Sequence, residues 1–453
     1  MNFKEKLKLS LGEDVVKDDE ETLLRYSKDS SDHPPILPSV VILPRNLNDV
    51  IRALEILYSE RIPITPRGSG TSLTGGSIPS EGGAVISLER MNKIKEIDEE
   101  NLTATVEPGV ITGDLINEVE KFNLFYPPDP ASLQSCTIGG NVAENAGGPR
   151  AFKYGTTKNY VLEIEAVIKN GERIRIGKKT KKWVVGYDLP SLFVGSEGTF
   201  GIITEITLRL IPKPPRFYTL LVAFGDGVKA GKSVSEMIKS SLFPTAIEFV
   251  DGKCISAVGE KIAPFLPKDT EAFLLVEFDG FGPEFERQVE IAYEIFQKNS
   301  ALEVFVAEDE GTRARLWSAR RRVFPSLESL GKLIRHEDVV VPRSKIPDLI
   351  AYTEEIERKT GLKVASFGHA ADGNIHVNIL YEEDQKEIME RAVDMVIEKV
   401  WELGGTASGE HGIGLIKKKH LLLEQGEALV NLQREIKRVF DPKNLFNPDK
   451  VFP

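Results

Sequence analysis

The chain is patterned in short apolar stretches separated by glycine and proline, which indicates a mixture of strands and helices. Nearly continuous apolar runs predict strands, and apolar positions repeated at helical spacing predict helices. In the middle of the chain the predicted strands are 217–224, 246–250, 272–278 and 302–307, and the predicted helices between them are 229–240 and 285–297. Strand–helix–strand units repeated in this way predict an antiparallel sheet with helices on one side.

The N-terminal part is richer in loops. Asn48 is positioned to cap a helix over 49–58, and Asn170-Gly171 predicts the turn of a β-hairpin between 161–169 and 172–176. Further elements are predicted from the same patterns: strands within 60–90, at 103–107, within 194–210 and at 375–380, and helices at 346–360, 383–403 and 429–440. The whole pattern is that of an α+β protein.

The proline-rich stretch 211–215 is the clearest linker signal in the chain. A length of 453 residues also exceeds what one core usually holds. We therefore expect a first domain over 1–213, a second over 214–400, and a C-terminal segment over 401–453.

Two glycine-flanked motifs near the C-terminus hold candidate chemistry. The first contains His369 and His376, and the second contains Glu410 and His411. A lone histidine on a strand is usually just hydrogen-bonded, but this pair recurs with a carboxylate in a second loop. Two imidazoles and one carboxylate suit a divalent transition metal with an open position for substrate. A strand after Asp372-Gly373 would place His376 and Asn378 on the same face.

Three glycine-rich segments lie in the first domain, at 66–76, 136–148 and 195–201. Glycines allow tight turns that bring backbone N–H groups up to a phosphate. The first segment has neither the Lys-Ser or Lys-Thr of a Walker loop nor the third glycine of the Rossmann fingerprint, where Leu73 stands. The missing fingerprint disfavours an NAD-type fold. A single segment of this kind could be ordinary loop glycine, but three in one domain favour an extended dinucleotide lying along the backbone.

Composition narrows the classes of function. The net charge of -11 argues against nucleic acid, which needs a basic surface. Two cysteines, Cys136 and Cys254, cannot form a disulfide framework or an iron–sulfur site. The charged N-terminus leads into no signal-peptide core, and no apolar run approaches the ~20 residues of a membrane span. We expect a cytoplasmic protein, with peripheral membrane association left open.

These motifs together resemble the flavoprotein superfamily of vanillyl-alcohol oxidase type (PCMH type). Within it the chain is similar to the branch of glycolate oxidase flavoprotein subunits, D-lactate dehydrogenases and D-2-hydroxyglutarate dehydrogenases, over nearly its whole length. The terminal motif 440–448 resembles the family's C-terminal signature. The resemblance implies a two-lobed FAD-binding domain over 1–213, a substrate or cap domain over 214–400 with an antiparallel sheet covered by helices, and a helical segment over 401–453 returning to the flavin.

The resemblance also implies roles for residues. Ser69 and Thr71 stand where some relatives carry a histidine bound covalently to FAD, so we expect non-covalent FAD. The expected metal ligands are His369, His376 and Glu410, with zinc first and manganese or iron(II) as alternatives. The expected catalytic residues are His411, Arg320 and Asn378. The expected FAD contacts are Arg67, Gly68, Ser69, Gly70, Thr71, Gly75, Pro130, Thr137, Gly140, Asn141, Asn145, Gly147, Glu197, Gly201, Ile203 and Asn447.

The implied reaction is oxidation of a D-2-hydroxy acid to the 2-oxo acid. A metal would chelate the substrate, His411 would remove the hydroxyl proton, a hydride would pass to flavin N5, and Arg320 would hold the carboxylate. Phe324 and roughly His336 stand where hydroxyglutarate enzymes carry a threonine and a lysine for the distal carboxylate. This difference favours a substrate with a small or apolar tail, such as lactate, glycolate or a longer 2-hydroxy acid.

Three alternatives remain at this point: an oxidase that reduces oxygen, a non-redox relative of alkyl-glycerone-phosphate synthase type, and a module that only relays electrons. A separate iron–sulfur subunit and a homo-oligomer are both compatible with the sequence.

Overall fold

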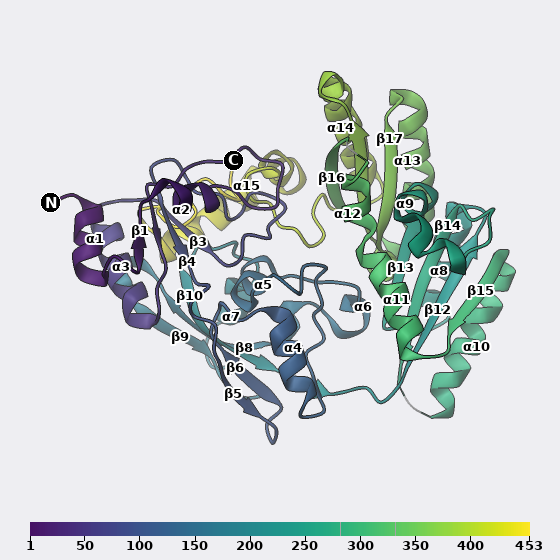
Figure 1. Cartoon of the computed structure of the whole chain (residues 1–453), viewed down its shortest axis with the longest axis horizontal. Coiled ribbons are helices and arrows are strands. Elements are labelled where there is room, and N and C mark those ends of the chain that lie inside the picture. Colours follow the sequence, from purple (N-terminus) through teal and green to yellow (C-terminus); the bar gives the residue numbers. More distant parts are fainter. Residues whose placement is uncertain (281, 331) are drawn as a thin grey trace. The chain divides into compact units, whose positions relative to one another are not determined.

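The structure is a computed structural model that describes residues 1–280, 282–330 and 332–453. It divides into two compact units (Figure 1). The first comprises 1–147, 155–213 and 410–453, and the second comprises 148–154 and 214–409. The chain therefore leaves the first unit within the proline-rich stretch and returns to it at Glu410.

The first unit contains two larger sheets. Its strands are β1 (Val16–Lys17), β2 (Val40–Ile42), β3 (Ile64–Arg67), β4 (Ala84–Ser87), β5 (Ile94–Asp98), β6 (Thr103–Val106), β7 (Leu124–Phe125), β8 (Val161–Val167), β9 (Arg173–Gly177), β10 (Ile202–Arg209) and β11 (Ile211–Pro212). One sheet has the order β1-β2-β4-β3, with parallel pairing of β4 to both β2 and β3. The other has the order β5-β6-β10-β8-β9 and is antiparallel throughout.

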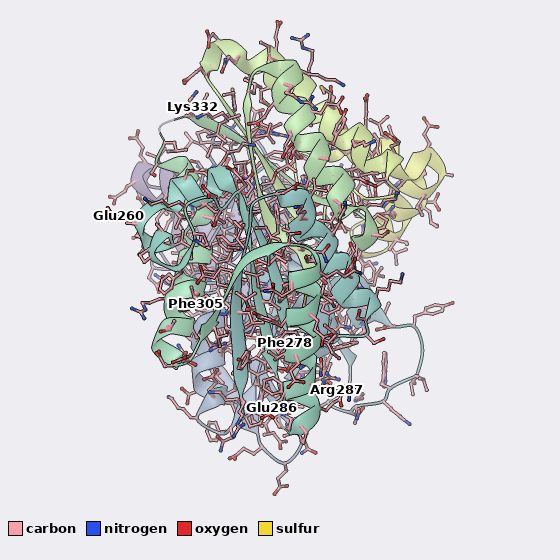
Figure 2. All side chains as sticks on the ribbon, turned by 90° about the vertical axis from the view of Figure 1, so that its right-hand side faces the viewer. Glu260, Phe278, Glu286, Arg287, Phe305 and Lys332 are labelled. Carbon is pink, nitrogen blue, oxygen red and sulfur yellow. The ribbon has the colours of Figure 1, made fainter. Side chains whose placement is uncertain are left out.

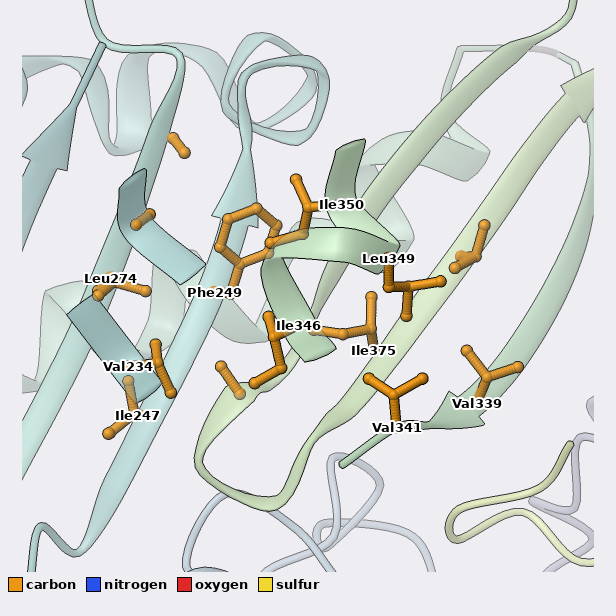
Figure 3. Close-up of a cluster of buried hydrophobic side chains, with 14 of the residues drawn as sticks. Val234, Ile247, Phe249, Leu274, Val339, Val341, Ile346, Leu349, Ile350 and Ile375 are labelled. Atoms are coloured by element: carbon orange, nitrogen blue, oxygen red, sulfur yellow. The ribbon is translucent and has the colours of Figure 1, made fainter. Parts of the chain in front are cut away.

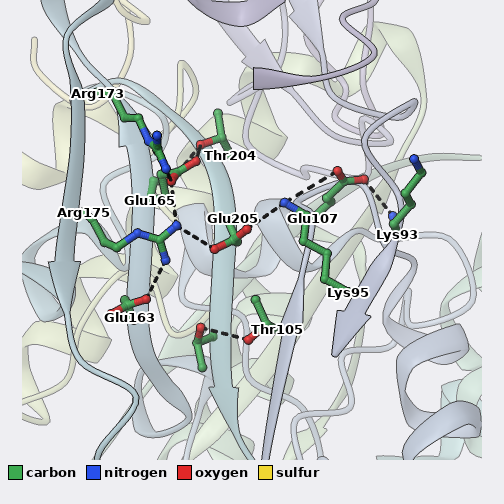
Figure 4. Close-up of polar contacts among 11 residues, drawn as sticks. Lys93, Lys95, Thr105, Glu107, Glu163, Glu165, Arg173, Arg175, Thr204 and Glu205 are labelled. Atoms are coloured by element: carbon green, nitrogen blue, oxygen red, sulfur yellow. Dashed lines mark hydrogen bonds and ion pairs between the residues drawn. The ribbon is translucent and has the colours of Figure 1, made fainter. Parts of the chain in front are cut away.

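The predicted hairpin at Asn170-Gly171 is confirmed, because β8 and β9 pair antiparallel around it. Both turn residues have positive φ, 56° and 77°, as a tight hairpin turn requires. Along the same hairpin, charged side chains cross β8, β9 and the neighbouring strand β10 (Figure 4). The Arg175 guanidinium contacts Glu163, Glu165 and Glu205 at 2.7, 2.7 and 2.8 Å. This network links three neighbouring strands.

Several helices of the first unit differ from the sequence-based expectation. They are α1 (Phe3–Leu11), α2 (Glu20–Arg25), α3 (Leu47–Ser59), α4 (Thr112–Glu120), α5 (Ile138–Glu144), α7 (Leu189–Phe193) and α15 (Lys418–Phe440). Helix α3 is capped by Asn46, whose side chain accepts from Asp49 N, so the assignment of Asn48 as the cap was wrong. Helix α5 lies inside the second glycine-rich segment, because the Thr137 side chain caps it by accepting from Gly140 N.

Helix α15 starts earlier than predicted, at Lys418 rather than near residue 429. It is interrupted at Gly426, whose φ of 76° and ψ of 163° are not helical. The predicted part therefore corresponds to the helix after this break. It ends where Asp441 precedes Pro442.

The second unit is built on one seven-stranded sheet. Its strands are β12 (Phe217–Phe224), β13 (Ala246–Asp251), β14 (Ala272–Asp279), β15 (Ala301–Ala307), β16 (Leu333–Val340), β17 (Lys363–His369) and β18 (Asn374–Tyr381). Its helices are α6 (Ala151–Tyr154), α8 (Gly227–Lys239), α9 (Gly252–Val258), α10 (Pro283–Lys298), α11 (Glu310–Arg321), α12 (Val323–Glu328), α13 (Ile346–Thr360) and α14 (Lys386–Glu402). The strand order is β15-β12-β14-β13-β17-β18-β16, and every neighbouring pair is antiparallel.

Helices cover both faces of this sheet, so the expectation of helices on one side was wrong. One core contains side chains from α8, α10, α13 and α14, including Val234, Ile346 and Ile350 (Figure 3). Exposed Glu286 and Arg287 mark the outer side of α10 (Figure 2). A second core packs α9, α11 and α12 against alternate strand positions. The physical reason is visible in β12, whose continuous apolar run offers buried side chains to both faces.

Candidate active site

The two histidines of the first motif lie on adjacent strands of the second unit. His369 ends β17 and His376 is the third residue of β18, and their ring centroids are 5.4 Å apart at 87°. The turn between them needs glycine, since a Cβ at Gly373 would lie 2.0 Å from the Val341 carbonyl oxygen. The prediction that His376 and Asn378 share one face is confirmed, because Val377 points into the opposite core.

Sheet register places a carboxylate beside each histidine. Glu248 on β13 pairs directly with His369, and Asp338 on β16 pairs directly with His376. The His369 Nδ1 lies 2.7 Å from Glu248 Oε1, and the His376 Nδ1 lies 3.8 Å from Asp338 Oδ1. Both carboxylates are fully buried. Only the first distance is that of a hydrogen bond, and 3.8 Å is an ion-pair separation. When the His369 Nδ1 donates to Glu248, its Nε2 carries the lone pair that can bind a metal, and the ring orientation is fixed.

A third cross-strand pair adds His336, which sequence reasoning did not place in the metal or catalytic set. His336 Nδ1 lies 2.7 Å from Asn378 Oδ1, and its ring is stacked on His376 at 5.2 Å. The Asn378 amide group donates to the carbonyl oxygens of Ala365 and His376. Asn378 is fully buried, so its polar atoms serve the sheet and the His336 ring.

Arg320 on α11 approaches this cluster from the helix layer. Its Nη2 contacts Glu248 Oε2 at 2.5 Å, and its guanidinium lies over the Phe367 ring at 4.7 Å. Of the three consecutive arginines only Arg320 is buried, while Arg321 and Arg322 are exposed. Glu248 is thus shared between a histidine and an arginine that were both expected to be functional.

The second motif begins the return segment of the first unit. The Glu410 carboxylate lies 3.6 Å from His411 Nε2. The Glu197 carboxylate accepts hydrogen bonds from the backbone N–H groups of Ile413 and Gly414, and the Thr74 hydroxyl donates to the His411 carbonyl oxygen. The loop is therefore held by hydrogen bonds from Glu197 and Thr74 to its main-chain atoms.

Within the first unit the three glycine-rich segments contact one another. A Cβ at Gly68 would lie 2.3 Å from Thr137 Oγ1, so the first segment passes directly against the start of α5. The Asn447 side chain donates to the carbonyl oxygens of Gly76 and Glu197, which joins the terminal motif to the first and third segments. Most of the expected FAD residues lie on these segments.

The first segment has the backbone that a phosphate site needs. Gly70 and Gly75 adopt positive φ, and a Cβ at Gly70 would lie 2.0 Å from the Arg67 guanidinium. Such turns present successive N–H groups to an anion. Burial lowers the pKa of Arg67, whose Nη1 donates to the Ser77 carbonyl oxygen. A dinucleotide phosphate fits this donor set.

The remaining expected contacts are placed in the same unit. Asn141 donates to the Thr112 hydroxyl, and Asn145, at φ 58°, accepts from the Thr156 hydroxyl and from Lys158 N. Pro130, Gly147, Gly201 and Ile203 are buried, while Ser69 is exposed and Thr71 and Gly140 are partly buried.

Family models match most of the chain. One, described as FAD binding domain, matches residues 38–177, and another, described as FAD linked oxidases, C-terminal domain, matches residues 213–451. Glycolate oxidase subunit GlcD of Bacillus subtilis is 42% identical over 100% of this chain and 97% of its own length. D-lactate dehydrogenase of Anaerostipes hadrus is 36% identical, over 91% of this chain and 89% of its own.

Solved structures agree on the fold. p-Cresol methylhydroxylase aligns with a TM-score of 0.81 at 19% identity, covering 99% of this chain and 96% of that one. Alkyldihydroxyacetonephosphate synthase aligns with a TM-score of 0.76 at 19% identity, covering 98% and 84%. The predicted fold class, α+β with a PCMH-type FAD-binding domain and antiparallel sheets, is confirmed. Among the described residues no helix has both the length and the apolar character of a membrane span. The chain belongs to the family of FAD-linked oxidases that includes glycolate oxidase subunits and D-lactate dehydrogenases.

Proposed function

We propose that this chain uses FAD to oxidise a D-2-hydroxy acid of the lactate or glycolate class to the 2-oxo acid. The observation that carries the proposal is the pair of perpendicular imidazoles, His369 and His376, each facing a buried carboxylate. His369 has a carboxylate hydrogen-bonded to its Nδ1, which is the arrangement that typically orients a metal-binding histidine. Relatives named glycolate oxidase and D-lactate dehydrogenase supply the substrate class.

We propose Glu410 as the third ligand of a divalent ion with His369 and His376. Covalent geometry supports this choice. The Gly409 N–H donates to Asp338 Oδ2 at 2.9 Å, beside His376, and consecutive Cα atoms are about 3.8 Å apart. Two imidazoles and a carboxylate suit zinc, and manganese or iron(II) as well. A bound ion would supply Lewis acidity toward the substrate hydroxyl.

The chain's own groups would then divide the remaining tasks. His411 would take the hydroxyl proton as a general base. Arg320 would bind the substrate carboxylate, since Glu248 engages one edge of a guanidinium that carries five N–H donors. Asn378 would act by orienting His336 instead of contacting substrate. The glycine-rich segments would hold FAD, which supplies the two-electron acceptor.

The residues around His336 favour a small substrate. The Phe324 ring meets the His336 ring edge-on at 5.1 Å and 74°, and both side chains are partly exposed. No lysine or arginine occupies these two positions, so a second carboxylate would gain no fixed charge there. We therefore expect lactate or glycolate to be preferred over 2-hydroxyglutarate.

Anaerobic mixing with D-lactate, L-lactate, glycolate and D-2-hydroxyglutarate tests the proposal. Bleaching of the flavin absorbance by D-lactate or glycolate, and slower bleaching by D-2-hydroxyglutarate, is expected. A flavin that none of these acids reduces would overturn the proposed activity. Following reoxidation with oxygen and with a dye separates an oxidase from a dehydrogenase.

We also propose that electrons leave through a separate iron–sulfur chain. Cys136 and Cys254 are both buried and unpaired as thiols, and the named relatives include a glycolate oxidase subunit. Co-purification of a partner that contains iron would support this assignment. Full turnover by the isolated chain with a natural quinone would count against it.

A further inference from the structure

We propose that Glu197 and Thr74 are positioning residues that fix the loop 410–414 and thereby aim His411. The inference rests on the proposed function, in which His411 is the base. It also gives Glu197 a role different from the FAD contact that the family resemblance implied.

The Glu197 carboxylate is committed to the loop through both oxygens. Oε1 accepts from Ile413 N at 2.8 Å, and Oε2 accepts from Gly414 N at 2.7 Å. Hydrogen bonds to an ionised acceptor are stronger and shorter than neutral ones. The side chain is buried, so these two bonds replace the water that the carboxylate would otherwise hold.

Thr74 forms hydrogen bonds with the same loop before and after the amides of Ile413 and Gly414. Its hydroxyl donates to the His411 carbonyl oxygen at 3.0 Å, and its own carbonyl oxygen accepts from Leu415 N at 2.8 Å. The peptide of the proposed base is therefore bonded directly to the first glycine-rich segment. Four bonds from two residues span the five-residue stretch 411–415.

Glu197 itself is held in an uncommon conformation. Its φ is 50°, a left-handed conformation that a residue with a Cβ keeps only where surrounding contacts enforce it. Its N–H donates to the Ala143 carbonyl oxygen at 2.8 Å, and its own carbonyl oxygen accepts from Asn447 Nδ2 at 2.8 Å. The main chain of Glu197 is thus held by a residue of α5 and by a residue of the C-terminal motif.

The glycines of the loop allow it to lie very close to Glu197 and Thr74, which we call the anchor. A Cβ at Gly412 would be 2.6 Å from Glu144 Oε2 and 3.0 Å from Glu197 Oε1, and a Cβ at Gly414 would be 2.2 Å from the Thr74 carbonyl oxygen. Both glycines also have positive φ. The loop can occupy this position only because these side chains are absent.

The carboxyl groups of Glu144 and Glu197 lie close together in a buried part of the first unit. Burial first, and then the charge of Glu197, raise the pKa of Glu144 well above its ordinary value. Glu144 Oε2 has no hydrogen-bond partner in the described part of the chain. Burial also raises the pKa of Glu197, but the amides of Ile413 and Gly414 act in the opposite direction. These two amides therefore favour the negative charge on Glu197 over Glu144.

The test compares four variants of the FAD-loaded enzyme: Thr74→Val, Thr74→Ser, Glu197→Gln and His411→Ala. Thr74→Val keeps the shape and removes the donor, while Thr74→Ser keeps the donor. We expect kcat to fall about 10–100-fold in Thr74→Val and Glu197→Gln with KM changed little, because a displacement of about 1 Å can cost 10²-fold. Thr74→Ser should retain most of the rate.

Hydrogen exchange supplies a readout that does not depend on turnover. The amides of the 410–416 peptide should exchange faster in Thr74→Val and Glu197→Gln than in the unmodified enzyme. Glu165→Gln is the matched control, because Glu165 is an equally buried carboxylate of the same unit whose partners include Arg175 and Thr204. It should leave exchange of this peptide unchanged.

The possible outcomes distinguish the positioning role of Glu197 and Thr74 from the proposed base role of His411. If His411→Ala lowers kcat but Thr74→Val and Glu197→Gln do not, the positioning role is overturned and the base role stands. Unchanged exchange in both anchor variants overturns the anchor itself. If His411→Ala leaves kcat intact, the proposed base role fails, and the positioning role fails with it. Should Glu197→Gln not fold, the Thr74 pair decides alone.

Discussion

Replacing Glu248 by glutamine should weaken metal binding without removing a ligand. Glu248 holds His369 through Oε1 and Arg320 through Oε2, and its side chain is fully buried. Glutamine keeps an oxygen acceptor of the same length but loses the negative charge. The variant therefore tests the charge that orients and polarises His369, while the sheet register stays in place.

The magnitude follows from the two contacts. Loss of a carboxylate partner behind a ligating histidine typically costs 10–100-fold in metal affinity, which corresponds to about 1.4–2.8 kcal/mol. Breaking a buried ion pair by removing one partner costs about 3–5 kcal/mol of stability. Because the glutamine side chain would still accept one hydrogen bond, we expect a stability loss at or below the low end of that range.

The matched control is Glu277→Gln. Glu277 is also fully buried, lies on β14 of the same sheet, and binds an arginine, with Arg313 Nε at 2.7 Å. Its other donors are Trp317 Nε1 and the Thr219 hydroxyl, and within the described part of the chain its side chain has no histidine partner. This variant should lose stability by a similar mechanism and keep the metal affinity of the parent.

The assay is a competitive titration of chelator-treated protein with zinc and a chromophoric chelator, beside a denaturant unfolding curve for each variant. We expect weaker zinc binding in Glu248→Gln alone and lower unfolding free energy in both variants. Equal zinc affinity in Glu248→Gln and the parent would refute the reasoning. An equal loss in Glu277→Gln would show that general destabilisation, and not the histidine partner, sets the affinity.

Three further changes have defined outcomes. His411→Ala should lower kcat ~10²–10⁴-fold while FAD and metal content stay constant, as absorbance and metal analysis would report. Glu144→Gln should raise the free energy of unfolding at pH 8 and leave it unchanged near pH 4. The reason is that a carboxyl whose native pKa is raised contributes stability at low pH, and this stability is lost as pH rises through that pKa. A parallel pH dependence of the unfolding free energy in the two proteins would contradict this. Gly409→Ala should destabilise the protein by about 1–3 kcal/mol, since the new Cβ would lie 2.4 Å from Asn374 Nδ2 and 2.8 Å from Asp338 Oδ1. Gly225→Ala, whose nearest contact is 3.7 Å, is the neutral comparison in denaturant unfolding.

Local pattern was enough to predict elements with a strong periodic or turn signal. The run 217–224 is β12 residue for residue, and 346–360 is α13. Helix α5 was missed because its two glycines suggest a loop, and only the Thr137 cap and its packing make a helix of it. The short helices α1 and α2 carry few buried residues, so their apolar periodicity is weak.

Candidate site residues could be predicted where an uncommon residue type stands in a distinctive local motif. Histidines 369 and 376 were singled out by their glycine-flanked motif, but their carboxylate partners were not. Glu248 lies 121 positions before His369 and meets it only through the pairing of β13 with β17. A single charge inside the apolar stretch 246–250 was the available signal. It indicates a buried carboxylate without indicating its partner.

In the motif 408–414, some residues are candidates for chemistry and others only fix the position of the backbone. Gly409 N donates to Asp338 within the second unit, and Ile413 N and Gly414 N donate to Glu197 within the first. Every non-proline residue offers a main-chain donor, so such bonds leave no side-chain signature in the sequence. Their only trace is the spacing of the glycines, where a Cβ would collide with the anchoring groups. In this motif the glycines therefore encode how closely the backbone lies on Asp338, Glu197 and Thr74. The proposed chemistry rests on Glu410 and His411, which stand between them.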